Sequence, residues 1–116
     1  MLWPILNDVA TGDTPAYPDI QPQRFNQPQQ RIVDAAVDVM GSLKGWRVFE
    51  HAESKVCAIR TTRLLRFKDD ITLRVLPDGE GWFRVHIRSK SRVGKADFGQ
   101  NARNIRELQA ALSQRL

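Results

Sequence analysis

From Trp46 onward, four segments of the chain alternate apolar and polar residues with a period of two; they cover residues 46–51, 55–62, 71–76 and 82 to about 90. This is the period of a β-strand with one buried face. Between the last two segments, the sequence Pro77-Asp78-Gly79-Glu80-Gly81 is typical of a hairpin turn. The pattern therefore predicts an antiparallel meander of four strands.

Two further segments repeat apolar residues at the spacing of a helix with one buried face. The first covers residues 28 to about 44, and the second covers residues 99 to about 115. Their apolar positions are Ile32, Val33, Ala36, Val37, Met40 and Leu43 in the first, and Ile105, Leu108, Leu112 and Leu116 in the second.

The ends of both helices carry residues that are typical of caps. We expect Asn26 or Gln27 to cap the first helix and Gly45 to end it. Asp97, followed three residues later by Gln100, has the form of a capping box at the start of the second helix.

Helices at both ends of a four-stranded meander predict an α+β fold, a two-layer sandwich in the order α-β-β-β-β-α with both helices on one face of the sheet. We expect residues 28–116 to form this single domain and residues 1–27 to form an extended, Pro-rich arm. The arm contains apolar residues such as Trp3, Tyr17 and Ile20. It therefore either packs on its own domain or docks on another molecule.

Composition narrows the function only slightly. The 18 Lys and Arg residues against 13 Asp and Glu give a net charge of +5, which favours acidic partners but is also a common charge for solubility. Cys57 is the only cysteine, so an intramolecular disulfide and a multi-cysteine metal site are excluded.

The apolar run at residues 1–6 is far shorter than a bilayer span and does not resemble a secretory signal. We expect the chain to be cytoplasmic or peripheral to a membrane.

The polar faces of the last two predicted strands should merge into one basic surface. Alternation places Thr72 and Arg74 beside Arg84, His86 and Arg88, with Trp82 at the edge. A basic sheet with an aromatic residue can bind single-stranded nucleic acid. Because this surface has only one aromatic residue, an ordinary solvated sheet face is the better interpretation. Nucleic acid is therefore the least favoured partner.

The segment from Arg88 into the second helix has the most specific chemistry. Basic and hydroxyl side chains precede Gly94 and a helix start, where unpaired N–H groups can bind a phosphate or carboxylate. The candidate ligand-binding residues are Arg88, Ser89, Ser91, Arg92, Lys95 and Asn101. A positioned loop with a helix cap at Asp97 is the competing interpretation.

Asp69 and Asp70 form a second charged group before the third strand. On an extended segment they point to opposite faces, which does not suit a general acid/base pair. We expect one of them to pair with Arg88 or Arg92. An enzyme would need one cleft lined by polar residues of both segments, and no catalytic motif supports that alternative. The residues are Asp70, Ser89, Ser91, Arg92, Asp97 and Asn101. His51, His86 and Cys57 lack metal-ligand spacing, so neither a metal nor another cofactor is expected.

Three parts of the chain resemble domain of unknown function (DUF) family 1499. They are Leu6-Asn7-Asp8-Val9-Ala10-Thr11 with Tyr17-Pro18-Asp19, the segment 61–70, and Arg88-Ser89 through Asn101-Ala102-Arg103. Asn7, Asp8 and Thr11 are part of the matching pattern. The resemblance therefore implies that the arm folds back onto the domain, beside Asp69, Asp70 and Arg92. Members of this family often follow a signal or membrane segment, which implies work at a membrane, in an envelope or in a plastid.

These observations favour a non-enzymatic binding domain. We expect an anionic small molecule, a lipid headgroup or a protein partner at residues 88–101. An enzyme that uses residues 69–70 with 88–101 is the alternative, and nucleic-acid binding on the basic sheet face is a lesser one.

Overall fold

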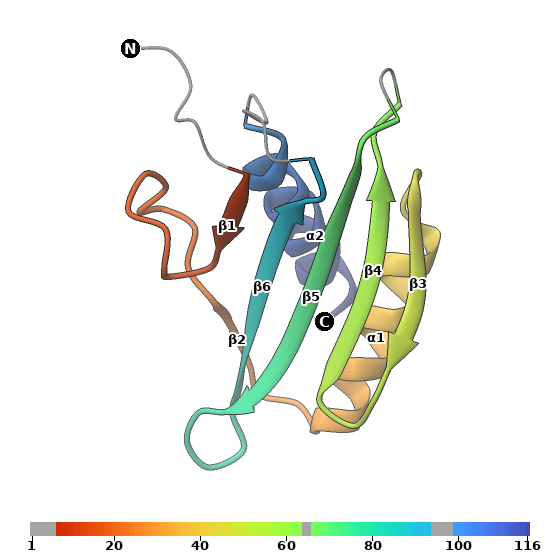
Figure 1. Cartoon of the computed structure of the whole chain (residues 1–116). Helices are drawn as coiled ribbons and strands as arrows, with labels where there is room; N and C mark the ends of the chain where they lie inside the picture. The colour runs from red at the N-terminus through yellow and green to blue at the C-terminus, as the bar shows by residue number, and fades with distance from the viewer. Residues whose placement is uncertain (1–6, 64–65, 94–98) are drawn as a thin grey trace.

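An antiparallel sheet runs through the whole molecule, in the order β1-β6-β5-β4-β3, with β2 also paired to β6 (Figure 1). This computed structural model describes residues 7–63, 66–93 and 99–116. The strands are β1 (Asp8–Ala10), β2 (Gln23–Phe25), β3 (Trp46–His51), β4 (Lys55–Thr61), β5 (Lys68–Pro77) and β6 (Phe83–Ser91).

The predicted meander is confirmed in β3 to β6. The described residues contain six strands rather than four, because the arm supplies β1 and β2. Both pair antiparallel with β6, with Val9 opposite Ser89 and Arg24 opposite Arg84. The arm therefore folds back onto its own domain, as expected. The third predicted strand also begins earlier than expected, at Lys68.

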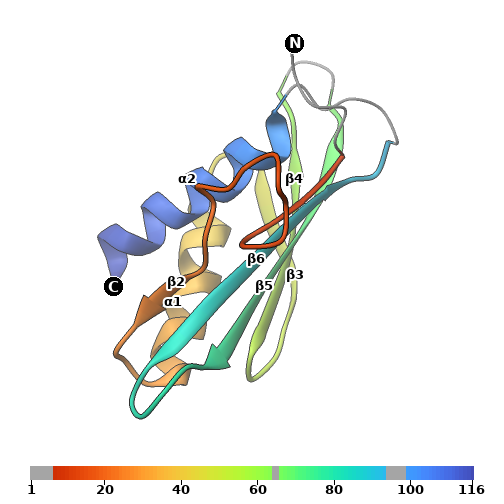
Figure 2. The ribbon, with the colours of Figure 1, turned by 90° about the vertical axis from the view of Figure 1, so that its left-hand side faces the viewer.

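Two helices, α1 (Gln29–Ser42) and α2 (Gln100–Arg115), cover one face of the sheet and leave the other face open (Figure 2). This confirms the predicted two-layer α+β sandwich. In the part of the chain that is described, neither helix is long and apolar enough to cross a membrane.

The predicted helix ends need correction. Pro28 is the N-cap of α1 and makes no side-chain cap bond, while the Gln27 amide reaches across to the Leu116 carbonyl oxygen at 3.0 Å. Helix α1 ends at Ser42, before Gly45, whose φ of 86° serves the turn into β3. The N-cap of α2 is Gly99, with a φ of 80°, and the predicted cap, Asp97, lies outside the described residues.

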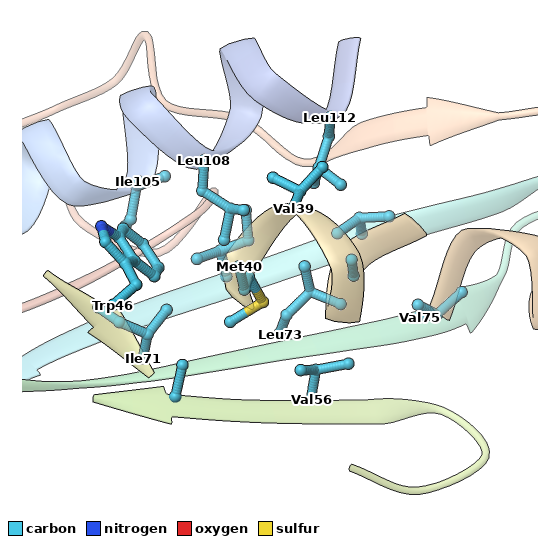
Figure 3. Close-up of a cluster of buried hydrophobic side chains, with 14 of the residues drawn as sticks. Val39, Met40, Trp46, Val56, Ile71, Leu73, Val75, Ile105, Leu108 and Leu112 are labelled. Carbon is cyan, nitrogen blue, oxygen red and sulfur yellow. The ribbon is translucent and has the colours of Figure 1, made fainter. Parts of the chain in front are cut away.

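The hydrophobic core lies between the sheet and the two helices (Figure 3). The inward faces of β4, β5 and β6 supply β-branched and leucine residues, which alternation had assigned to the buried face. Helix α2 packs its Ile105–Leu108–Leu112 stripe against them, and Met40 of α1 is fully buried beside Trp46.

One strand edge stays open. β3 pairs only with β4 among the described strands, and the register shifts between Val48 and Glu50. This β-bulge bends the edge, and 49% of the Phe49 surface is exposed to solvent there.

Candidate functional site

A group of polar side chains is buried between the sheet and the start of α2. Asp69 and Ser89 continue the inward faces of β5 and β6, two residues from Ile71 and Ile87 respectively. Asn101 and Asn104 lie on the inward face of α2 and meet them there, and all four side chains are at most 2% exposed. We call these four residues the buried polar cluster.

The members of the buried polar cluster bond to one another. The Ser89 hydroxyl donates to Asn101 Oδ1 at 2.6 Å and accepts from Asn104 Nδ2 at 3.0 Å. Asn104 Nδ2 also donates to Asp69 Oδ2 at 2.8 Å. Buried polar groups are costly unless they are bonded, so this arrangement ties β5, β6 and α2 together.

The edge of the buried polar cluster is bonded as well. Asn101 Nδ2 donates to the Ser91 hydroxyl at 2.8 Å, and Asn104 Oδ1 accepts from Arg60 at 3.1 Å and from the Gln100 amide at 2.8 Å. Ser89 and Asn101, two of the predicted ligand-binding residues, therefore bond inside the protein, and Ser91 bonds at its margin. Asn104 was not singled out from the sequence, although its position three residues after Asn101 places it on the apolar stripe of α2.

The two aspartates of the 69–70 pair point to opposite faces, as predicted. Asp70 lies on the open face, where the Arg92 guanidinium donates two hydrogen bonds to its carboxylate, both 3.0 Å long. This bond raises the pKa of Arg92. The expected pair between an aspartate of this group and Arg92 is present.

A second ion pair fastens the arm. Arg88 Nε and Nη2 donate to the two carboxylate oxygens of Asp8 at 2.8 and 2.5 Å. The hydrogen bond from Arg88 lowers the pKa of the Asp8 carboxyl, and the same bond raises the pKa of Arg88. Nearby, the Ser91 N–H donates to the Asn7 carbonyl oxygen at 2.7 Å. The two arm residues thus lie beside the ends of β5 and β6, as the resemblance implied.

Two predicted residues, Lys95 and Asp97, lie outside the described residues, as does Gly94. The predicted anion site is thus only partly described. The structure pairs its two described arginines, Arg88 and Arg92, with separate carboxylates and does not gather them around one ligand position.

The open face of the sheet contains a groove of about 310 Å³ next to the arm. It lies over β5 and β6, and the turn after β1 forms its side wall. We call it the sheet groove; its polar lining consists of Thr11, Asp13, Thr72, Arg74, His86 and Arg88.

Small side chains create the hollow. In the sheet register, Arg88 lies between Ala10 of β1 and Thr72 of β5, and His86 lies opposite Arg74. Directly opposite side chains on neighbouring strands are about 5 Å apart, and diagonal ones are about 7–8 Å apart. The short side chains on both sides of Arg88 therefore leave room above the sheet between longer neighbours.

His86 has a fixed orientation in the floor of the sheet groove. Arg84 Nε donates to His86 Nε2 at 2.9 Å, so this nitrogen acts as an acceptor and carries no proton in this arrangement. Nδ1 lies 3.4 Å from the hydroxyl of Thr11, which is 1% exposed and also accepts from the Ile87 N–H at 3.1 Å. The imidazole thus joins the sheet to the arm.

Arg74 differs from Arg84, Arg88 and Arg92 on this face, which are bonded to other side chains. Its side chain is exposed, and within the described residues its guanidinium forms no hydrogen bond or ion pair. The alternation of the last two strands placed Arg74, His86 and Arg88 on one surface. Thr11 belonged to the arm pattern that was expected to fold back onto the domain. Its place in the wall of this groove, together with Asp13, was missed, because it depends on where the arm returns to the sheet.

Among residues 7–63, 66–93 and 99–116, no three or more His, Cys, Asp or Glu side chains lie close enough together to hold a metal ion. Cys57 is a free, buried thiol on β4.

A family model described as "Protein of unknown function (DUF1499)" matches residues 5–112. No curated protein matches the chain. Among solved structures, the chain is similar to the crystal structure of TTHA0849 from Thermus thermophilus, with 13% sequence identity and a TM-score of 0.47. The similarity covers 93% of this chain and 95% of the other.

Proposed function

The chain belongs to the DUF1499 family, whose description names no activity, and we propose from the geometry that it is a binding module for a small molecule with an anionic group. The ligand occupies the sheet groove. The observation that carries this proposal is the Arg74 guanidinium, which has no acidic partner among the described residues and lines a hollow together with Arg88.

Two cations on a sheet diagonal suit one anion. Arg74 and Arg88 are diagonal neighbours on β5 and β6, because Arg88 lies opposite Thr72. Their mutual repulsion is relieved when a carboxylate or phosphate binds between them. Asp8 occupies only Nε and Nη2 of Arg88, so the third guanidinium nitrogen, Nη1, can donate to the ligand.

The buried polar cluster supports an architectural role instead. The Ser89 hydroxyl is fully buried and bonded to two asparagines, so it is a poor candidate nucleophile. For this reason we place the ligand on the open face of the sheet and not among residues 89, 101 and 104.

The test compares Arg74→Gln with Arg47→Gln. Arg47 is exposed on the same open face, because its neighbour Trp46 points into the core, but it lies on β3, away from the sheet groove. Both substitutions remove one positive charge. We expect titration with inorganic phosphate and with succinate to shift the NMR amide signals of Thr72, Arg74 and His86 saturably. Arg74→Gln should weaken this binding at least about 5-fold, which corresponds to about 1 kcal/mol, while Arg47→Gln should leave it unchanged. Equal weakening by both substitutions would mean unspecific attraction to a basic surface and would contradict the proposal.

Lipid headgroups carry the same anionic groups, and the resemblance to this family implied work at a membrane. Sedimentation with phosphatidylglycerol vesicles separates the two sources. Binding to these vesicles that disappears in Arg74→Gln but not in Arg47→Gln assigns the ligand to a headgroup. Binding of the free anions alone assigns it to a dissolved molecule.

A further inference from the structure

We propose that the ligand of the sheet groove is a small zwitterion, with its anionic group at Arg74 and Arg88 and an ammonium group at Asp13. This inference rests on the proposed function and names its ligand class. The observation behind it is that one groove presents opposite charges from two different parts of the chain: the arginines come from β5 and β6, and the carboxylate comes from the arm.

The backbone holds Asp13 firmly at the rim. The Thr11 N–H donates to the Ile87 carbonyl at 2.9 Å, the Gly12 N–H to that of Ile20 at 2.8 Å, and the Asp13 N–H to that of Ala10 at 3.2 Å. Gly12 has a φ of 75°, which glycine adopts without strain. The turn therefore fixes the start of the Asp13 side chain relative to β6.

The Asp13 carboxylate is available to a ligand. The residue is exposed, and within the described residues its side chain forms no hydrogen bond or ion pair. Other acidic residues near the arm differ in this respect, since Asp8 is bonded to Arg88 and Asp19 to Arg106. Asp13 and Arg74 are thus two unpaired opposite charges in one groove.

His86 lies in the floor of the sheet groove, between the arm and Arg74. The bond from Arg84 to its Nε2 holds the imidazole in place there. A volume of about 310 Å³ is at the lower end of ligand pockets, which indicates a ligand of about amino-acid size. A purely anionic ligand of that size would be repelled by Asp13, so the groove discriminates against it.

The experiment compares ω-amino acids with the carboxylic acids that lack the amino group. The probes are glycine, β-alanine, 4-aminobutyrate and 6-aminohexanoate against acetate, propionate, butyrate and hexanoate, titrated into the full chain by NMR at neutral pH. The four amino acids differ in the distance between their ammonium and carboxylate groups. We expect at least one amino acid to bind at least 5-fold more tightly than its matched acid. Asp13→Asn should abolish that advantage without weakening the plain acid, whereas Arg74→Gln should weaken both members of the pair.

Each result bears on a different claim. If plain acids bind and depend on Arg74, but no amino acid binds more tightly than its acid, the zwitterion inference is wrong and the proposed function stands. If Asp13→Asn leaves the advantage of the amino acid intact, the inference is also wrong, because another group then recognises the ammonium. If neither series binds at Arg74, the proposed function fails together with the inference. Asp34→Asn is the matched control for lost acidic charge, since Asp34 is exposed on α1, on the helix side of the sheet.

Discussion

Replacing Ser89 with alanine tests the buried polar cluster most directly. The substitution removes one hydroxyl that bonds to both asparagines of α2. Asn101 Oδ1 loses the bond from the Ser89 hydroxyl and Asn104 Nδ2 loses one acceptor, in a place where Ser89 is 0% exposed. Water therefore cannot replace the lost bonds without opening the contact between the sheet and α2.

The size of the effect follows from these two losses. Removing one partner of a buried hydrogen bond costs about 1–3 kcal/mol, and Asn104 keeps its bond to Asp69. We expect Ser89→Ala to lower the free energy of unfolding by about 2–4 kcal/mol. For a chain of this length that lowers the melting temperature by roughly 7–14 °C.

Ser91→Ala is the matched control. Ser91 accepts a single side-chain bond from Asn101 Nδ2 and is half-buried, so water can take its place. We expect a loss below about 1 kcal/mol. Urea unfolding followed by tryptophan fluorescence measures both variants, with Trp46 as a buried reporter. A Ser89→Ala protein within about 0.5 kcal/mol of the unaltered protein, or a Ser91→Ala protein that is equally destabilised, would refute the structural role of the cluster.

Two further predictions concern the arm and the glycines. The Arg88 hydrogen bond lowers the pKa of Asp8 in the folded state, so the stability from this pair is complete above the ordinary carboxyl pKa of about 3.9 and is lost as the pH falls through the lowered value. In urea unfolding between pH 6 and 2, the free energy of unfolding of Asp8→Asn should therefore fall less than that of the unaltered protein. An equal fall in both proteins would contradict this. Gly45→Ala should destabilise the protein by about 1–3 kcal/mol, because φ is 86° and the new Cβ would lie 2.9 Å from the Thr61 carbonyl oxygen. Gly41→Ala, in open space on α1, should stabilise the protein by about 0.5–1 kcal/mol. Thermal melts distinguish the two variants, and equal shifts of the melting temperature would count against the close approach at Gly45.

The sequence predicted the elements whose signal is local. Strands β3, β4 and β6 and both helices follow from periodicity over six or more residues, and the structure has them within two residues of the predicted ends. β1 and β2 have three residues each, too few for alternation to appear. They form only because β6 offers them a partner more than fifty residues later in the chain.

The buried polar cluster and the sheet groove could likewise be predicted only where the signal is local. Asp69 and Ser89 are in phase with the buried residues of their strands, so their burial could have been inferred from the alternation alone. That they meet Asn104, 35 residues from Asp69 along the chain, could not be inferred, because it depends on how α2 crosses the sheet. The sheet groove likewise needs the wall formed by Asp13, which only the return of the arm creates.

The bulge between Val48 and Glu50 bears on how this chain behaves at high concentration. A straight outer strand with free N–H and C=O groups is a template on which another chain can add a strand and begin an aggregate. The shifted register interrupts the even spacing of those groups along β3, so a second copy cannot align with the whole strand. On the opposite side, the arm covers parts of β6 with its own backbone. The arm therefore covers part of one side of the sheet and the bulge interrupts the other edge, and both features oppose the addition of strands from other copies.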